Sequence, residues 1–573
     1  MRRTLLRLAP ATLLLALALV LSACGDDDEG AKQGGKLTVI NAGDFEYLDP
    51  GASYYQFDYM VHYATQRPLY SNKPNDINPT PDLAQSQPEI SEDGKTVTIK
   101  LKPGVRFSPP VDREATSADV KYALERAFMG GVDNGYVGTY FADVEGVPEV
   151  GGEYKEIPGI QAPDERTIVF KLTRPTGAVV AQALVLPASA PVPREYAERY
   201  DREEPNQYGR HQVATGPYMI ENDASGKLTG YQPNRRIKLV RNPNWDKETD
   251  YRPAPADEIE IQEGNEDTNA ASREVLEGDG KITGDIVAPA PAVERALENF
   301  EDQIELPASG GWRYIALNTK VEPFDDIDVR KAVVAGFDRD ALRLTRGGET
   351  IGDVPTHFIP PDFPGFEESG GEQGFGLDFL ANPKGDQELS AEYFRKAGFD
   401  SGKYEGNEKL LMVGDDDEPG NKTAVVAREK FEEMGFDIEF RAVPHETMLE
   451  RFCGRPSAEV AICANVGWIK DFNDAQTLLQ PTFSGDAILE ANNSNWAQLD
   501  VPEINRAMRE AEILTDPGAR ARAWADINRM ITEQAPGVPY VWDLQANLRS
   551  EDVAGVINKW NATWDLSFTG LKE

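Results

Sequence analysis

The chain has 573 residues, of which 59 are basic and 97 acidic, so its formal net charge is −38. With 27% charged and 40% hydrophobic residues it has a globular composition, and it is long enough for two or more domains. The negative charge repels nucleic acid and anionic lipid surfaces, so we expect no nucleic-acid partner.

Residues 1–23 have the pattern of a secretory signal. Arg2 and Arg3 precede an apolar stretch from Leu8 to Val20, and small residues follow it. The tetrad Leu-Ser-Ala-Cys ending at Cys24 resembles a bacterial lipobox, which implies cleavage before Cys24 and acylation of its thiol. Acyl chains would anchor the protein to the outer face of the cytoplasmic membrane. The alternative is an uncleaved single-span anchor, for which the apolar stretch is short.

Residues 24–35 are polar, glycine-rich and acidic, which predicts a flexible tether between the acylated Cys24 and the first strand. Calcium binding by the acidic run is the weaker alternative, because the EF-hand pattern is absent.

Further along the chain, short strands alternate with helices of moderate length, which predicts an α/β fold. Alternating apolar residues indicate half-buried strands, and apolar residues at helical spacing indicate amphipathic helices. The expected strands are 36–40, 95–101, 168–172 and 540–544. The expected helices begin at Thr116 or Ser117, after Asp328 and near Asn421, and two more include 504–511 and 524–531.

Two cysteines, Cys453 and Cys463, remain if Cys24 is acylated. Outside the cytoplasm such a pair favours a disulfide, with two reduced, buried thiols as the alternative. No histidine is close to them in sequence, so they make a poor metal site, and we expect neither a metal nor a cofactor.

Several segments, in order from residue 36 to the C-terminus, resemble the peptide-binding proteins of ABC importers, the peptide/nickel type known as family 5. The segments are Leu48-Asp-Pro, Pro81-Asp-Leu-Ala-Gln-Ser, Ile90 to Phe107, Thr116 to Phe128, Ala214-Thr-Gly-Pro-Tyr, Arg241-Asn-Pro-Asn-Trp and Leu317 to Ala332. The chain departs from the family pattern at 108–115, where the usual His-Asp-Gly-Thr-Pro turn is missing.

The resemblance implies a periplasmic-binding-protein-like fold, with two hinged lobes and an extra smaller lobe. Lobe I is expected to be discontinuous. The expected ranges are 36–67, 212–308 and 535–573 for lobe I, 68–211 for the extra lobe and 309–534 for lobe II.

The resemblance also implies a site for the ligand. In oligopeptide-binding relatives a Gly-Trp-x-x-Asp-Tyr motif supplies a carboxylate that holds the peptide's ammonium group, and position for position this carboxylate is Asp471. Trp468 would be an apolar wall beside it, and Phe472 completes the motif. Without the resemblance, Asp471 is better interpreted as the cap of a following helix. Some relatives carry an arginine where this chain has Asn465, so ligand length and recognition of a ligand carboxylate stay open.

A second candidate segment is 41–47, which resembles the strand end that pairs with the peptide backbone in relatives. Its candidate residues are Asp44, Phe45, Glu46 and Tyr47, although Phe45 and Tyr47 suit a core equally well. A disulfide at Cys463 would stiffen the approach to Trp468, or else staple an exposed hairpin.

We therefore expect a monomeric, lipid-anchored solute-binding protein that captures oligopeptides or similar small solutes for an ABC permease and ATPase complex. A peptide sensor, an extracellular chaperone or a binder of another solute on the same fold is not separable by sequence. A secreted hydrolase is disfavoured, because no Gly-x-Ser-x-Gly elbow is present and Leu449 stands where a zinc motif starting at His445 needs its second histidine.

Overall fold

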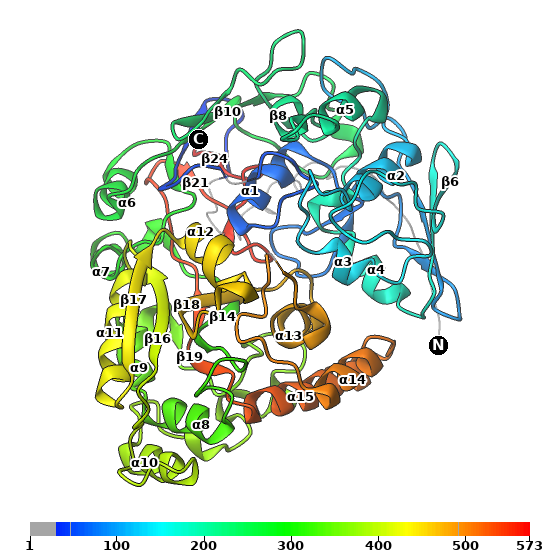
Figure 1. Ribbon diagram of the computed structural model, residues 1–573. Helices are drawn as coiled ribbons and strands as arrows, with labels where there is room; N and C mark the ends of the chain where they lie inside the picture. The colour runs from blue at the N-terminus through cyan, green and yellow to red at the C-terminus, as the bar shows by residue number, and fades with distance from the viewer. Residues whose placement is uncertain (1–29, 46, 491) are drawn as a thin grey trace, which may run out of the picture.

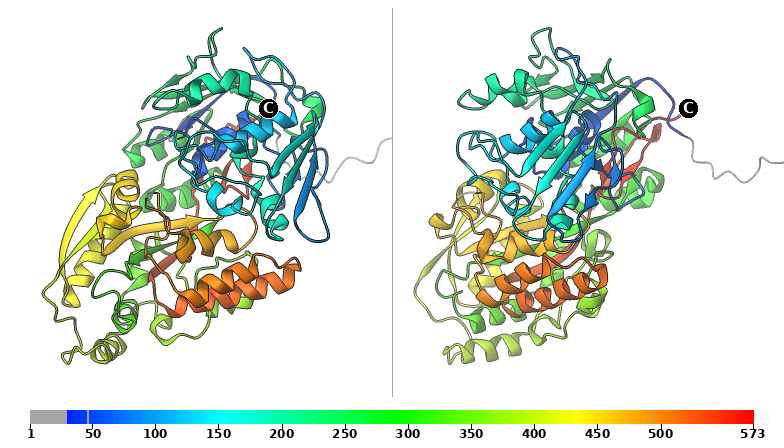
Figure 2. Two further views of the ribbon diagram at one scale, coloured as in Figure 1. Left: turned by 45° about the vertical axis from the view of Figure 1, so that its right-hand side comes forward. Right: turned by 90° about the vertical axis from the view of Figure 1, so that its right-hand side faces the viewer.

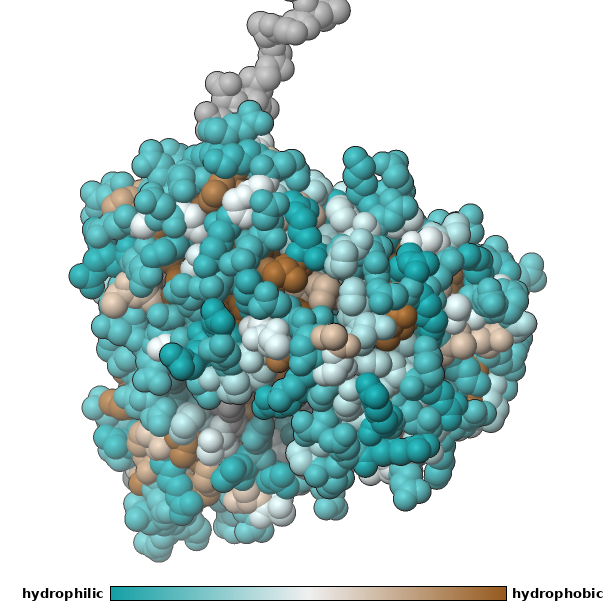
Figure 3. Space-filling view, turned by 90° about the horizontal axis from the view of Figure 1, so that it is seen from above, coloured by the Kyte–Doolittle hydropathy of each residue, from teal (hydrophilic) through white to brown (hydrophobic). Residues whose placement is uncertain are grey.

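The computed structural model describes residues 30–45, 47–490 and 492–573, and it places three bodies around three separate sheets (Figure 1). We name these bodies lobe I, the extra lobe and lobe II after the sheet that each contains. The face drawn in Figure 3 is predominantly hydrophilic, with small scattered apolar patches, which agrees with the acidic composition.

Lobe I contains a six-stranded mixed sheet in the order β12-β1-β11-β10-β8, with β9 beside β10. β1 is parallel to β11 and β12, whereas β10 is antiparallel to β11. The strands are β1 Lys36–Ile40, β8 Tyr218–Ile220, β9 Tyr231–Gln232, β10 Arg236–Arg241, β11 Glu258–Gln262 and β12 Lys281–Thr283, and the helices are α1 Gln56–Thr65, α6 Thr268–Glu277 and α7 Ala290–Asn299.

The extra lobe contains a four-stranded antiparallel sheet in the order β4-β5-β7-β6. Val97 and Ile99 on β5 are buried and alternate with the half-buried Thr96 and Thr98 and the exposed Lys100, as the pattern predicts. A capping box starts α2, in which the Asp119 carboxylate accepts the backbone N–H of Thr116 at 2.8 Å. The elements are β4 Glu89–Ile90, β5 Thr96–Lys100, β6 Ile160–Asp164, β7 Thr167–Lys171, α2 Ser117–Arg126, α3 Val137–Tyr140, α4 Gly177–Ala183 and α5 Arg194–Asp201.

Lobe II contains a six-stranded mixed sheet in the order β15-β19-β14-β18-β16-β17, with a hydrophobic core on each face. The strands are β14 Ala308–Leu317, β15 Gly352–Asp353, β16 Lys409–Asp415, β17 Asp437–Val443, β18 Ile462–Ile469 and β19 Gly537–Leu544. The helices are α8 Ile327–Gly336, α9 Arg339–Leu344, α10 Gln387–Lys396, α11 Gly420–Glu433, α12 His445–Thr447, α13 Gln476–Phe483, α14 Pro502–Ala511 and α15 Pro517–Glu533. α14 and α15 lie side by side in lobe II, and α10 lies below them (Figures 1 and 2).

β19 differs from the expected division, because it lies in the sheet of lobe II although its residues fall within the range 535–573 that we assigned to lobe I. It pairs antiparallel with β14, where Trp312 lies opposite Trp542. Both strands contribute buried residues to the cores on each face of the sheet, and this long-range pairing cannot be inferred from local patterning.

The chain passes between lobes I and II in two adjacent segments. β13 (Ile304–Glu305) pairs antiparallel with β20 (Asn547–Leu548), and β14 and β19 continue the two segments into lobe II. Between them, the Gln545 N–H donates to the carbonyl oxygen of Pro307 at 2.9 Å. Two neighbouring crossings of this kind are the geometry of a hinge.

The final part of the expected tether packs on lobe I. The Lys32 N–H donates to the Leu571 carbonyl at 2.8 Å, and Ala31 forms a β-bridge with Lys572. The Gly34 N–H donates to the Pro255 carbonyl at 2.8 Å. Backbone hydrogen bonds therefore hold residues 31–35 against lobe I. Their glycine-rich composition did not predict this packing. Residues 1–29, including the expected signal segment and Cys24, lie outside the described residues.

Candidate functional site

The centre of the site is Asp471, in the loop that follows β18. Only 5% of the residue is exposed. Its carboxylate accepts a hydrogen bond from the Tyr54 hydroxyl at 2.8 Å and another from the Tyr140 hydroxyl. Tyr54 precedes α1 of lobe I, and Tyr140 ends α3 of the extra lobe. Asp471 thus lies where all three lobes meet.

The environment of Asp471 favours the protonated carboxyl group. Burial raises its pKa to about 7 from the ordinary 3.8, and the two tyrosine hydrogen bonds oppose that rise because they stabilise the anion. Burial also raises the pKa of Tyr54 well above its usual range, so that tyrosine stays a donor. Within the described part of the chain no cationic side chain forms an ion pair with Asp471. Among the residues that the structure describes, this buried carboxylate has no counter-ion.

The helix-cap interpretation of Asp471 does not describe this geometry. α13 begins at Gln476, whose N–H donates to the Asp474 carboxylate at 2.9 Å. The Asp471 side chain faces the tyrosines of the other lobes instead, and only its backbone N–H contacts α13, by donating to the Thr477 hydroxyl at 3.3 Å.

Trp468 and Phe472 flank Asp471 and contact the other lobes. The Trp468 ring meets the Tyr54 ring edge-on, with the centroids 5.5 Å apart, and its indole N–H donates to the Thr477 carbonyl at 2.8 Å. Phe472 is buried in the hydrophobic core of the extra lobe, where its ring meets that of Tyr140 edge-on at 5.0 Å. Both aromatic side chains therefore help to hold lobe II against the other two lobes.

Lys470 is the nearest cationic neighbour of Asp471 in the sequence, but its ammonium group contacts other residues. It donates to the Ser309 carbonyl at 2.8 Å and lies 4.9 Å from the centre of the Trp560 ring of lobe I. Burial lowers the pKa of Lys470 to about 7.

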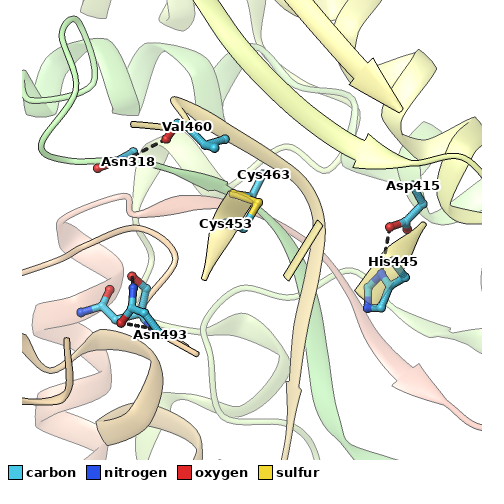
Figure 4. Close-up of a disulfide and its surroundings, with 8 residues drawn as sticks. Asn318, Asp415, His445, Cys453, Val460, Cys463 and Asn493 are labelled. Atoms are coloured by element: carbon cyan, nitrogen blue, oxygen red, sulfur yellow. Dashed lines mark hydrogen bonds and ion pairs between the residues drawn. A yellow bond between two sulfur atoms is a disulfide. The ribbon is translucent and has the colours of Figure 1, made fainter. Parts of the chain in front are cut away.

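Asn465 lies inside the sheet of lobe II and is buried. Its amide donates to the Asp415 carboxylate at 2.5 Å, and its oxygen accepts the Tyr540 hydroxyl at 2.5 Å. His445 contacts the same carboxylate through Nδ1 at 2.8 Å, as Figure 4 shows. The structure therefore places Asn465 in a polar network, away from the tyrosines that surround Asp471.

The described residues of segment 41–47 form contacts within lobe I. The Tyr231 hydroxyl donates to the Asp44 carboxylate at 3.2 Å, and Phe45 is buried in the core of lobe I. The Tyr47 N–H donates to the Asp58 carboxylate at 3.0 Å. Phe45 is thus a core residue, and Glu46 lies outside the described residues.

Asp44 shares its surroundings with a second carboxyl group. Burial, followed by the neighbouring Asp44 carboxylate, raises the pKa of Glu263 to about 8. A protonated Glu263 avoids the repulsion that a second negative charge beside the Asp44 side chain would cause in this part of lobe I.

Cys453 and Cys463 are joined by a disulfide with an S–S distance of 2.16 Å. Both residues are buried, and Cys463 lies on β18, next to β14 in the sheet (Figure 4). The bridge is therefore part of the hydrophobic core of lobe II rather than a staple on an exposed hairpin.

Sequence reasoning missed Tyr54 and Tyr140, because their partner is far away in the sequence and neither lies in a motif that the sequence analysis singled out. In the described ranges 30–45, 47–490 and 492–573, no helix is long and apolar enough to cross a membrane. Over the same residues no group of three His, Cys, Asp or Glu side chains could hold a metal ion.

Comparison with known proteins identifies the family of this chain. The model of the bacterial extracellular solute-binding proteins, family 5 Middle, matches residues 78–489. Because this match covers more than half of the chain, the protein belongs to that family.

Among individual proteins, the chain is similar to two curated binding proteins over most of its length. It is 24% identical to the oligopeptide-binding protein OppA of Bacillus subtilis (strain 168) over 564 residues, which cover 95% of this chain and 96% of that one. It is also 24% identical to di/tripeptide-binding protein 1 of Pseudomonas aeruginosa (strain UCBPP-PA14), with 80% of each chain covered.

Among solved structures, the clavulanic acid biosynthesis oligopeptide binding protein 2 superposes with a TM-score of 0.79 at 26% identity and covers 95% of this chain and 96% of its own. The Haemophilus influenzae OppA complex with the peptide RPPGFSPFR gives a TM-score of 0.75 at 20% identity, with 95% and 99% covered, and it supports the fold.

Proposed function

We propose that this protein is the solute-binding component of an ABC importer and that it captures short peptides between lobes I and II. The observation that carries the proposal is Asp471, a buried carboxylate at the junction of three lobes with hydroxyl groups as its hydrogen-bond donors. The relatives named as di/tripeptide- and oligopeptide-binding proteins support peptide as the solute class.

The chemistry of Asp471 suits the ammonium group of a peptide. A carboxylate that is desolvated together with an ammonium group forms a strong, charge-assisted contact, and the contact leaves peptide side chains free to vary. Tyr54 and Tyr140 would orient the carboxylate while the ligand supplies the missing positive charge. A bound ligand would thereby stabilise the ionised form of Asp471, which burial otherwise disfavours.

Ligand entry requires the lobes to part, because Asp471 is enclosed in the arrangement described above. We propose that the crossings at 304–308 and 544–548 are the hinge. Lobe I would then comprise 31–67, 212–307 and 545–573, the extra lobe 68–211, and lobe II 308–544. The contacts of Trp468 and Phe472 would break on opening and form again around the captured solute.

We extend the proposal to the processing, membrane anchoring and partners of the protein. Residues 1–23 would be removed as a signal, and Cys24 would be acylated and hold a monomer at the outer face of the cytoplasmic membrane. Lobes I and II would present the loaded form to a permease and ATPase complex. The role is binding and delivery rather than catalysis.

Asp471→Asn tests the proposal, because it removes the negative charge and keeps the shape of the side chain. Peptide that co-purifies with the native protein is identified by mass spectrometry, and its affinity is measured by calorimetry. We expect Asp471→Asn to cost about 2–5 kcal/mol of binding free energy, because it leaves the ammonium group buried without a partner.

Asp526→Asn on α15 is the matched control, since it removes the same charge from an exposed position of lobe II. Equal affinities of the wild type and Asp471→Asn would contradict the assignment of Asp471. A native protein that carries no peptide and binds none would contradict the proposed function as a whole.

A further inference from the structure

The extra lobe contacts lobe II at a second place besides Asp471, around the side chain of Arg174. Arg174 lies between β7 and α4 of the extra lobe, and it reaches the end of α14 in lobe II (Figure 1). Its guanidinium donates to the Glu512 carboxylate at 2.7 Å and to the Arg509 carbonyl at 2.9 Å. These contacts cross from one lobe to another, so they belong to the closed arrangement.

The extra lobe is joined to lobe I by buried ion pairs, and it would therefore move with lobe I. Arg126 of the extra lobe is buried and donates to the Asp49 carboxylate of lobe I at 2.8 Å. Arg252 of lobe I is buried and pairs with Asp82 of the extra lobe. Separating the partners of a buried ion pair is strongly destabilising. On opening at the proposed hinge, the contact between Arg174 and lobe II would separate instead.

The extra lobe holds Arg174 in place for this contact. The Asp143 carboxylate accepts the Arg174 guanidinium at 3.2 Å and the Thr176 hydroxyl at 2.9 Å. Because both partners lie in the extra lobe, Arg174 would keep them when the lobes part. A side chain that is already ordered loses less freedom when it forms a further contact. The Arg174 side chain is 37% exposed, whereas that of Glu512 is 8% exposed, so the acceptor is well shielded from water.

Behind Glu512, hydrogen bonds lead to the loop after β18, which carries the carboxylate of the ligand site. Glu512 accepts the Gln480 amide through its other oxygen, and Gln480 accepts the Gln476 amide at 2.6 Å. Gln476 accepts the Arg520 guanidinium at 2.5 Å, and the same guanidinium donates to the Asp474 carboxylate. A continuous path of hydrogen bonds therefore joins the contact at the extra lobe to the loop of the ligand site.

We propose that Arg174 and Glu512 are positioning residues for ligand capture, which latch the extra lobe onto lobe II around the captured solute. Through the path to Asp474, this latch also steadies the loop that carries Asp471. The inference rests on the proposed function, because it concerns the release of a captured solute. A contact that forms as the lobes close acts on the rate of dissociation and leaves the rate of association unchanged.

The test measures both rate constants by surface plasmon resonance on the immobilised protein. The probe is a synthetic peptide whose sequence has been identified by mass spectrometry of the native preparation. We expect Arg174→Gln to raise the dissociation rate about tenfold, a figure that allows for the partial exposure of the arginine, while the association rate stays the same. Arg174→Lys keeps the positive charge and should restore part of the slow dissociation.

Arg166→Gln is the matched control. Arg166 donates to the Glu114 carboxylate at 2.7 Å, its side chain is 41% exposed, and both partners lie within the extra lobe. It should release the peptide at the wild-type rate. Equal dissociation rates of Arg174→Gln and Arg166→Gln would overturn the latch and leave peptide binding intact. A wild type that carries no peptide and binds none would overturn the proposed function and this inference together.

Two further variants test the pairing and the path. If Arg174 and Glu512 act as one contact, Glu512→Gln combined with Arg174→Gln should release the peptide about as fast as either single variant. Single effects that multiply in the double variant would contradict the pairing. Gln480→Met keeps the ion pair and interrupts the path, so it should also speed release, and a wild-type dissociation rate in this variant would overturn the link to the loop.

Salt gives a measurement that needs no variant. Because Arg174 is partly exposed, dissolved ions should weaken its contact with Glu512. Raising the salt concentration from about 0.05 M to about 0.5 M should therefore speed release of the peptide from the wild type. A dissociation rate of the wild type that does not respond to salt would contradict the latch, even where a variant fails to fold.

Discussion

The titration of Asp471 predicts that acidification closes the ligand-free protein. With the lobes in contact, burial raises the pKa of Asp471 to about 7, whereas a carboxylate exposed by opening would return to its ordinary value of 3.8. Closing therefore takes up a proton between these two values. The closed form is most favoured below the lower pKa, and this advantage is lost as the pH rises through about 7.

The size of the pKa shift of Asp471 sets how strongly pH changes the balance between the closed and open forms. A shift of about three pKa units corresponds to ~4 kcal/mol between the protonated and ionised closed forms. Between pH 7.5 and 5.5, Asp471 alone changes the ratio of closed to open molecules by roughly 25-fold.

Lys470 opposes this effect. Burial lowers its pKa to about 7 when its ammonium group lies beside Trp560, so closing releases a proton from Lys470. Because the residue keeps some exposure, its opposing contribution is at most about fourfold over the same range. The expected net gain of the closed form is therefore at least about sixfold.

The assay is small-angle X-ray scattering of protein stripped of ligand, at pH 7.5, 6.5 and 5.5. The radius of gyration of the wild type should fall with the pH. Asp471→Asn removes one of these two titrating groups and keeps Lys470, so the radius of gyration of this variant should stay constant or rise on acidification. Asp526→Asn should behave like the wild type. An identical pH response in the wild type and Asp471→Asn would refute the reasoning.

Two further predictions concern stability. Loss of the disulfide through Cys453→Ser and Cys463→Ser should lower the free energy of unfolding by about 3 kcal/mol, since the bridge closes a short loop in the unfolded chain. Denaturant titration measures this free energy, and an unchanged midpoint of unfolding would contradict the prediction. Asp201→Ala should lower the free energy of unfolding by about 3 kcal/mol, because Arg126 is fully buried between Asp49 and Asp201 and would lose a hydrogen-bonded partner. A shift in melting temperature no larger than that of an exposed Asp→Ala control would contradict this prediction.

Local patterning predicted those elements whose hydrophobic contacts repeat regularly along the chain. The alternation of Val97 and Ile99 marks β5, and Thr116 with Asp119 marks the start of α2. Gly435 lies just beyond the end of α11 with a φ of 101°, a conformation that glycine adopts readily. In each of these cases the physical cause lies within a few residues of the element.

Pairings between distant segments could not be predicted in the same way. The motif around Asp471 drew attention to that residue through a family resemblance, but Tyr54 and Tyr140 belong to two other lobes, and only the folded chain brings their hydroxyl groups to it.

The bridge between Ala31 and Lys572 has a practical consequence for any study of this protein. Both ends of the described chain lie in lobe I. A surface linkage, affinity tag or fluorescent fusion at either end would therefore be attached to lobe I. With the proposed hinge at 304–308 and 544–548, the other half would carry no attachment and could still move. A distance reporter of closure accordingly needs its second probe within lobe II, where the exposed face of α15 offers positions such as Asp526.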